Sequence, residues 1–252
     1  SSAASDVYKR QEVGGRTSHS AILARALEIP AVLSIDNITK ELIDGEVVIV
    51  DGTDGSVIAS PGSEEVEKYR ELKKRFDDEK KELLKLAGKP TVTADGRRVE
   101  LLCNIGKPDD CALVIERDGE GVGLFRTEFL YMDSKEQPGE EQQFEAYKKA
   151  AMTLKGKPVT IRTLDVGGDK DIPYLGLEKE DNPFMGFRAV RYCIKNQDLY
   201  KTQLRALMRA SAFGDIRIMI PLVTCVEEVR AVKKLVAEIA SELDQNGVAY
   251  NK

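Results

Sequence analysis

The second half of the chain alternates short apolar runs with amphipathic stretches, and this pattern constrains its fold most. The runs lie at residues 99–105, 122–125, 159–161 and 216–223, and the amphipathic stretches include residues 144–154, 199–212 and 226–243. Strands that alternate with helices in this way form parallel sheets, because each helix returns the chain to the edge where the strand began. The region therefore predicts an α/β fold with four strand–helix units.

The first part of the chain is organised differently. Residues 47–59 hold two β-branched runs around Asp-Gly-Thr-Asp-Gly, which predicts a β-hairpin. Pro61-Gly62-Ser63 then marks a boundary, with Ser63 as the expected N-cap of a helix. Apolar residues recur in that helix mainly at intervals of three or four, and its Lys/Glu runs predict a solvated face. Residues 61–88 are therefore expected to form a charged linker helix.

Composition excludes several classes of protein. With 42% apolar and 32% charged residues among 252, the chain has the balance of a soluble globular protein. Its net charge of −5 argues against a general nucleic-acid binder. No segment approaches the roughly 18 apolar residues of a membrane span, and the N-terminus lacks a secretory pattern. We therefore expect a cytoplasmic location without membrane insertion.

The cysteines do not predict a metal or redox site. Cys103, Cys111, Cys193 and Cys225 are too widely spaced for a zinc knuckle or a Cys-x-x-Cys pair, and the chain has a single histidine. We interpret them as reduced and mostly structural, with Cys103 buried in its apolar run.

That single histidine, His19, follows Gly-Gly-Arg-Thr-Ser at the expected start of a helix that stops at Glu28-Ile29-Pro30. Glycines let the backbone approach a ligand closely, and the unpaired N–H groups and dipole of a helix N-terminus favour an anion. A phosphorylated imidazole would be stabilised there. The alternative is that His19 is a helix cap or an ordinary polar residue.

Three arginines are candidate anion ligands. Arg126 and Arg162 directly follow the apolar cores of predicted strands, and Arg188 follows the loop-like Asn182-Pro183. Since the carboxyl ends of parallel strands meet at one edge, the three guanidinium groups could converge on a small anion, which they would bind in bidentate fashion. The alternative for each is a surface ion pair.

Four motifs resemble enzyme I of the phosphoenolpyruvate:sugar phosphotransferase system. They are Gly-Gly-Arg-Thr-Ser-His-Ser-Ala-Ile-Leu-Ala-Arg (14–25, followed by Ile-Pro-Ala-Val at 29–32), Gly-Val-Gly-Leu-Phe-Arg-Thr-Glu (121–128), Ile-Arg-Thr-Leu-Asp-Val-Gly-Gly-Asp-Lys (161–170) and Asn-Pro-Phe-Met-Gly-Phe-Arg (182–188). The first motif is shared with pyruvate phosphate dikinase and phosphoenolpyruvate synthase. The third favours enzyme I over these two relatives.

The resemblance implies a domain organisation. Residues 12–60 would be part of a phosphohistidine β/α domain, and residues 61–88 its linker helix. Residues 89–252 would form the first half of a (β/α)8 TIM-type phosphoenolpyruvate-binding barrel. Residues 1–11 match no strand expected before the Gly pair and are interpreted as non-native or disordered.

The resemblance also implies an activity. His19 would accept the phosphoryl group of phosphoenolpyruvate and pass it to the phosphocarrier protein HPr, with Arg126, Arg162 and Arg188 binding the substrate. Thr17, Asp165 and Lys170 lie in matching motifs, but we expect them to cap helices or shape loops. The resemblance implies that the full-length protein forms a homodimer. It also implies that the protein uses Mg²⁺, and the acidic residues that bind this metal are expected beyond Lys252. A half barrel leaves sheet edges unpaired, so this chain alone is expected to be poorly stable and inactive.

Two alternatives stay open. The chain could be a fragment of a dikinase or synthase; it has no Walker-type nucleotide loop, but an upstream domain could supply nucleotide binding. It could also be a non-enzymatic regulatory phosphoprotein in which His19 is a mark read by a partner. The coding sequence on either side of the segment would distinguish these readings.

Overall fold

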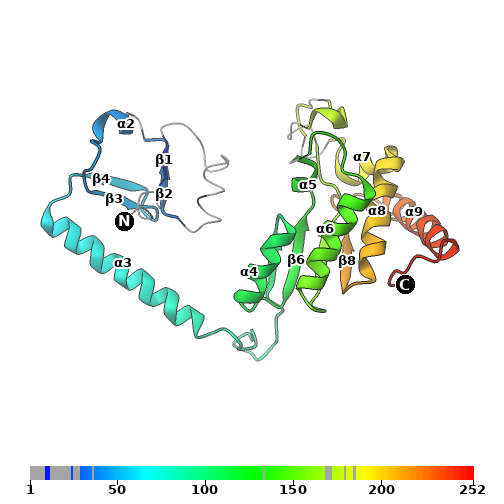
Figure 1. The fold of residues 1–252 in the computed structure, drawn as a ribbon, viewed down its shortest axis with the longest axis horizontal. Coiled ribbons are helices and arrows are strands. Elements are labelled where there is room, and N and C mark those ends of the chain that lie inside the picture. Colours follow the sequence, from blue (N-terminus) through cyan, green and yellow to red (C-terminus); the bar gives the residue numbers. More distant parts are fainter. Residues whose placement is uncertain are drawn as a thin grey trace. The chain divides into compact units, whose positions relative to one another are not determined.

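A computed structural model describes residues 9–11, 24, 29–35, 37–132, 134–167, 172–178, 180–183 and 186–252. The chain divides into two units, Ser1–Leu86 and Ala87–Lys252, which Figure 1 shows as blue to cyan and green to red parts. In the described part of the chain, no helix is long and apolar enough to cross a membrane.

The first unit contains two small sheets. Strand β1 (Lys9–Gln11) pairs in parallel with β2 (Ala31–Leu33), and the short helix α2 (Ile38–Glu41) follows. The prediction for residues 1–11 does not anticipate β1, whose pairing uses backbone groups and needs no side-chain pattern. The predicted hairpin is confirmed: β3 (Val48–Asp51) pairs antiparallel with β4 (Ser56–Ala59).

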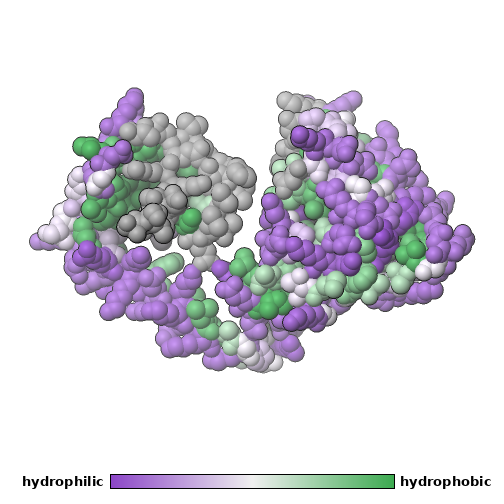
Figure 2. Space-filling view, viewed as in Figure 1, coloured by the Kyte–Doolittle hydropathy of each residue, from purple (hydrophilic) through white to green (hydrophobic). Residues whose placement is uncertain are grey.

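Helix α3 (Ser63–Leu84) ends the first unit, and none of its residues is buried. Its charges pair with each other along the surface, as in Arg70–Glu67 and Lys81–Asp78, and Figure 2 shows the helix as mainly hydrophilic. The N-cap is Gly62 and not Ser63 as predicted, because the Gly62 N–H donates to the Glu65 carboxylate (3.0 Å). Glu65 thereby fixes the extended Gly62 as the cap and leaves Ser63 as the first helical residue.

The second unit is built on a parallel sheet, as predicted. Its four strands pair in the order β5-β6-β7-β8. They are β5 (Leu102–Ile105), β6 (Gly121–Arg126), β7 (Val159–Arg162) and β8 (Ile216–Met219). Helices follow each strand (Figure 1), so the predicted strand–helix alternation is confirmed. They are α4 (Cys111–Glu116), α5 (Glu128–Met132), α6 (Glu140–Thr153), α7 (Ala189–Lys195), α8 (Gln197–Ser211) and α9 (Val226–Gln245), with 3₁₀ turns at Pro108–Asp110 and Pro173–Leu175.

One core cluster lies between one face of this sheet and helices α4, α6 and α8. Val159 and Ile161 of β7 are fully buried against Tyr147 of α6 and Leu207 of α8. The alternate residues of the strands point to the opposite face, where Arg217 of β8 is exposed. A second core cluster joins α7, α8 and α9.

Two predicted strands are shorter than their apolar runs. The run over 99–105 becomes a strand only at Leu102, because Leu101 remains 56% exposed and the preceding segment instead forms a bridge between Val92 and Arg98. Cys103, within β5, is half-buried and not buried as predicted. The run over 216–223 ends as a strand at Met219, shortly before Pro221, which has no N–H to donate to a ladder.

Candidate functional site

Two of the predicted site residues end neighbouring strands. Arg126 is the last residue of β6 and Arg162 the last residue of β7, and the two are register partners in the parallel pair. The side chain of Thr127, the next residue after Arg126, donates a hydrogen bond to the carbonyl oxygen of Arg162 (2.8 Å). The carboxyl edge of the sheet therefore holds both arginines side by side, at the position where α/β enzymes collect functional groups.

Asp165 joins two of the three arginines. Its Oδ2 lies 3.0 Å from Nη1 of Arg162, and its Oδ1 accepts hydrogen bonds from Nε (3.2 Å) and Nη2 (2.9 Å) of Arg188. Arg188 is only 5% exposed and caps the start of α7. The sequence predicts that Asp165 caps a helix or shapes a loop; in the structure its carboxylate contacts the side chains of Arg162 and Arg188.

Glu128 is a second carboxylate at this edge, and the sequence analysis did not single it out. It is 2% exposed at the start of α5, and its Oε1 contacts Nη2 of Arg162. The sequence offered one signal for a role of Glu128: it is an acidic residue two positions after Arg126, which ends a strand. The pairing itself depends on the neighbouring strand 34 residues away and is not readable from local pattern.

Arg126 has a different environment. Its guanidinium carbon lies 5.3 Å from the centre of the Phe129 ring, a cation–π contact. Gly106, which follows β5, allows the ring this position, because a Cβ atom there would lie 3.0 Å from two ring carbons. Arg126 is exposed, so its guanidinium remains accessible from solvent.

Arg191 connects the loops that follow β7 and β8. Its Nε (3.0 Å) and Nη2 (2.7 Å) donate to the carbonyl oxygen of Gly186, and its Nη1 donates to that of Leu222 (3.3 Å). Gly186 lies two residues before Arg188. The contacts of Arg191 therefore fix the loop that delivers Arg188 to the site.

The charges at this edge favour an anion. Three guanidinium groups, of Arg126, Arg162 and Arg188, lie at or follow the strand ends, whereas the carboxylates that contact them come from Glu128 and Asp165. Among these five described side chains the positive charges outnumber the negative ones by one, and guanidinium forks match the geometry of phosphate and carboxylate oxygens. The arrangement can bind a small anion at the carboxyl edge of the sheet.

The structure does not describe every residue that the sequence singles out. His19, Thr17 and Lys170 fall outside the described residues. Among the described residues, no three His, Cys, Asp or Glu side chains are grouped as a metal site.

Burial raises the pKa of the Cys111 thiol to about 11 and that of Cys193 to about 12, so both stay protonated, as expected of structural cysteines.

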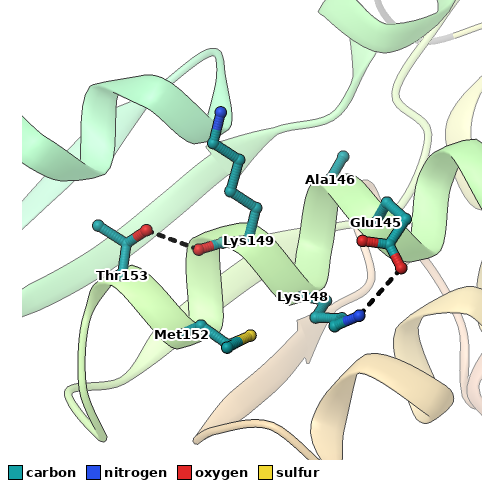
Figure 3. Close-up of a pocket in the computed structure, with 6 residues that line it drawn as sticks. All are labelled: Glu145, Ala146, Lys148, Lys149, Met152 and Thr153. Carbon is teal, nitrogen blue, oxygen red and sulfur yellow. Dashed lines mark hydrogen bonds and ion pairs between the residues drawn. The ribbon is translucent and has the colours of Figure 1, made fainter.

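An open pocket of about 500 Å³ lies on α6 and contains none of the site residues. Its lining comes from one helix, as Figure 3 shows, and its polar groups already have partners: Lys148 pairs with Glu145 (3.0 Å), Thr153 donates to the Lys149 carbonyl oxygen (2.7 Å), and the Lys149 ammonium pairs with Asp109 outside the pocket. Side chains from a single helix do not converge on a ligand, so we assign this pocket no role.

Two family models match this chain. Residues 80–252 match the family model described as "PEP-utilising enzyme, PEP-binding domain", and residues 11–55 match "PEP-utilising enzyme, mobile domain". The first match includes all three arginines, and the second includes His19.

Curated relatives are similar over nearly the whole chain. The phosphoenolpyruvate-protein phosphotransferase of Priestia megaterium is 50% identical over 96% of the chain, and that of Bacillus subtilis (strain 168) is 49% identical over 95%. The chain spans 42% of the length of each of these two relatives. A solution structure of an enzyme I is 46% identical and covers 28% of this chain and 29% of its own, with a TM-score of 0.27. The match over residues 80–252 shows that this chain belongs to the PEP-utilising enzymes.

Proposed function

We propose that the protein carrying this chain is a phosphoenolpyruvate-protein phosphotransferase of the enzyme I type. It would transfer the phosphoryl group of phosphoenolpyruvate to His19 and then to HPr, the first step of the sugar phosphotransferase system. The observation that carries the proposal is the placement of three arginines at the carboxyl edge of the sheet: Arg162 and Arg188 share Asp165, and Arg126 is the register partner of Arg162. The names of its relatives favour an enzyme I over a dikinase.

The proposed mechanism assigns the arginines to the two anionic groups of the substrate. Phosphoenolpyruvate carries a phosphate and a carboxylate, and the planar guanidinium groups would bind their oxygens and offset charge during transfer. An imidazole nitrogen of His19 would attack the phosphorus in line. As the N–P bond forms, the bond between phosphorus and the bridging oxygen breaks, and pyruvate leaves as its enolate.

The same proposal extends to the domains. Residues 12–60 would belong to a phosphohistidine domain, residues 61–88 to a linker helix, and residues 89–252 to the first half of a (β/α)8 barrel. The four parallel strands in chain order support the last assignment. Residues 1–11 would not be native to the domain. We propose a cytoplasmic homodimer for the complete protein.

Mg²⁺ is proposed as the family's cofactor. The carboxylates nearest the arginines do not fit a Mg²⁺ site, because Oε1 of Glu128 and both carboxylate oxygens of Asp165 contact guanidinium groups. Its ligands are therefore proposed beyond Lys252, and no step above depends on them.

The test is phosphorylation of the complete protein by phosphoenolpyruvate labelled in the phosphate. We expect acid-labile label on the wild type, its transfer to added HPr, and no label on His19→Ala. Arg126→Ala should raise the KM for phosphoenolpyruvate by about tenfold or more, since charge-assisted hydrogen bonds are lost.

Arg98→Ala is the matched control for the arginine variant. Arg98 is an exposed arginine of the same unit, paired with Glu120 at 2.8 Å, and its removal should leave KM unchanged. Label that persists on His19→Ala, or equal KM values for both arginine variants, would contradict the proposed function.

A further inference from the structure

The side chain of Gln203 is fully buried in helix α8 and contacts the ends of two strands. Its Oε1 accepts a hydrogen bond from the backbone N–H of Leu164 (2.9 Å), and its Nε2 donates to Oγ1 of Thr127 (3.3 Å) and to the Tyr147 hydroxyl (3.3 Å). We propose that Gln203 is a positioning residue, which sets the strand ends that carry the substrate-binding arginines.

The orientation of this carboxamide follows from its partners. The Leu164 N–H can only donate, so the oxygen of Gln203 must face it and the nitrogen must face Thr127 and Tyr147. The Thr127 hydroxyl donates to the Arg162 carbonyl oxygen (2.8 Å), which leaves its lone pairs to accept from Gln203. The Tyr147 hydroxyl similarly donates to Gln143 (3.0 Å). Every bond in the cluster therefore has one donor and one acceptor.

These contacts lie next to the site residues along the chain. Thr127 follows Arg126, and Leu164 precedes Asp165, which holds Arg162 and Arg188. The buried Gln203 side chain thus contacts the residue that follows β6, Thr127, and the backbone just after β7, at Leu164. Because binding depends on how well the arginines are oriented, displacement of either strand end weakens recognition of the substrate. The inference rests on the proposed function for the identity of that substrate.

Gln143 provides a matched control. It is also fully buried and belongs to the same polar network. It accepts from the hydroxyls of Tyr131 (3.3 Å) and Tyr147 (3.0 Å) and donates to the Pro138 carbonyl oxygen (2.9 Å). These partners lie on α5, on α6 and before α6, and none is adjacent in sequence to an arginine of the site. Replacing either glutamine therefore removes buried hydrogen bonds. Only the replacement of Gln203 also removes contacts with the residues that follow β6 and β7.

The experiment compares Gln203→Met and Gln143→Met in the complete protein. Methionine keeps the length of the side chain and removes the amide. Both variants should unfold at lower temperature than the wild type. At a temperature where both are folded, Gln203→Met should raise the KM for phosphoenolpyruvate about tenfold, with Gln143→Met within about twofold of wild type. Equal KM changes in the two variants, or none in either, would overturn the proposal.

A second pair of variants covers the case in which Gln203→Met does not fold. Thr127→Val removes the hydroxyl that links Gln203 to Arg162, and Thr127→Ser retains it. We expect Thr127→Val to raise the KM for phosphoenolpyruvate and Thr127→Ser to leave it near that of the wild type. If the two variants have the same KM, Gln203 has no positioning role.

Hydrogen exchange separates this inference from the proposed function. In Gln203→Met the Leu164 amide should exchange at least about tenfold faster than in Gln143→Met, whatever reaction the protein catalyses. If the wild type transfers no phosphate from phosphoenolpyruvate, the proposed function fails even when the amide result holds. If it transfers phosphate but the Leu164 amide exchanges at the same rate in both variants, the positioning role alone fails.

Discussion

Asp165 shows how single residues shape the site. Its two oxygens divide between Arg162 and Arg188, and both arginines are largely removed from solvent. A carboxylate that is shared in this way compensates two charges that would otherwise repel each other at the edge of the sheet. The orientation of the arginines is therefore coupled to one side chain.

Replacement of this carboxylate should be strongly destabilising. In Asp165→Asn the amide can accept hydrogen bonds but no longer neutralises the buried arginines, so we expect a loss of about 3 kcal/mol in the free energy of unfolding. Urea unfolding of the chain measures it. Asp215→Asn is the control, because Asp215 pairs with Arg217 at the surface (2.9 Å) and should lose less than about 1 kcal/mol. Equal losses in both variants would show that the contacts of Asp165 with Arg162 and Arg188 stabilise the fold no more than a surface ion pair does.

The sequence could place some of these residues but not their partners. Arg126 and Arg162 were predictable as strand ends, since an apolar run directly precedes each. The partners that orient them come from distant segments: Glu128 is 34 residues from Arg162, and Gln203 is 39 from Leu164. Such pairs exist only once the strands and helices have packed, and a single sequence has no local signal for them.

At the scale of elements, periodicity predicted the strands and helices better than their ends. The helix at 226–243 is observed as Val226–Gln245, and the hairpin at 47–59 is formed as expected. Ends depend on individual hydrogen bonds that compete with each other, as the shift of a cap from Ser63 to Gly62 shows. Helix starts are therefore places where one side chain has a measurable effect on stability.

The start of α9 gives a pH-dependent case. Oε2 of Glu228 accepts hydrogen bonds from the backbone N–H groups of Thr224 (2.6 Å) and Cys225 (3.3 Å). The first of these bonds chiefly lowers the pKa of this carboxyl below its ordinary value of 4.5. A lowered pKa in the folded state means that Glu228 stabilises the fold above about pH 4.5 and loses that contribution as pH falls through the folded pKa.

Glu228→Gln should therefore lower the free energy of unfolding by about 1 kcal/mol at pH 7. The difference from wild type should shrink as the pH is lowered from 5.5 to 3.5, measured by urea unfolding across this series. Glu227→Gln is the control, because Glu227 is exposed and pairs at the surface with Arg230 (3.6 Å). A deficit of Glu228→Gln that stays constant with pH would contradict the assignment of the effect to the ionised carboxylate.

At the scale of the whole molecule, the second unit has one covered and one open sheet face among the described residues. Ile216 and Ile218 of β8 pack against the helical core, whereas Arg217 between them is exposed and Met219 is half-buried. Strands β5 and β8 are the two edges of this sheet. An open face with two free edges is typical of part of a barrel, and such edges promote pairing with other chains.

Residues 87–252, produced alone, should keep their helices but self-associate and bind a hydrophobic dye, because the proposed remaining strands would otherwise cover this face. Sedimentation velocity between about 5 and 200 µM measures the association. Met219→Lys adds a charge to the open face without touching the helical core, and should shift the protein towards monomer. Ile218→Val, on the covered face, should leave association unchanged. A unit that stays monomeric and binds no dye would show that its sheet needs no further strands, and the half-barrel assignment would then be abandoned.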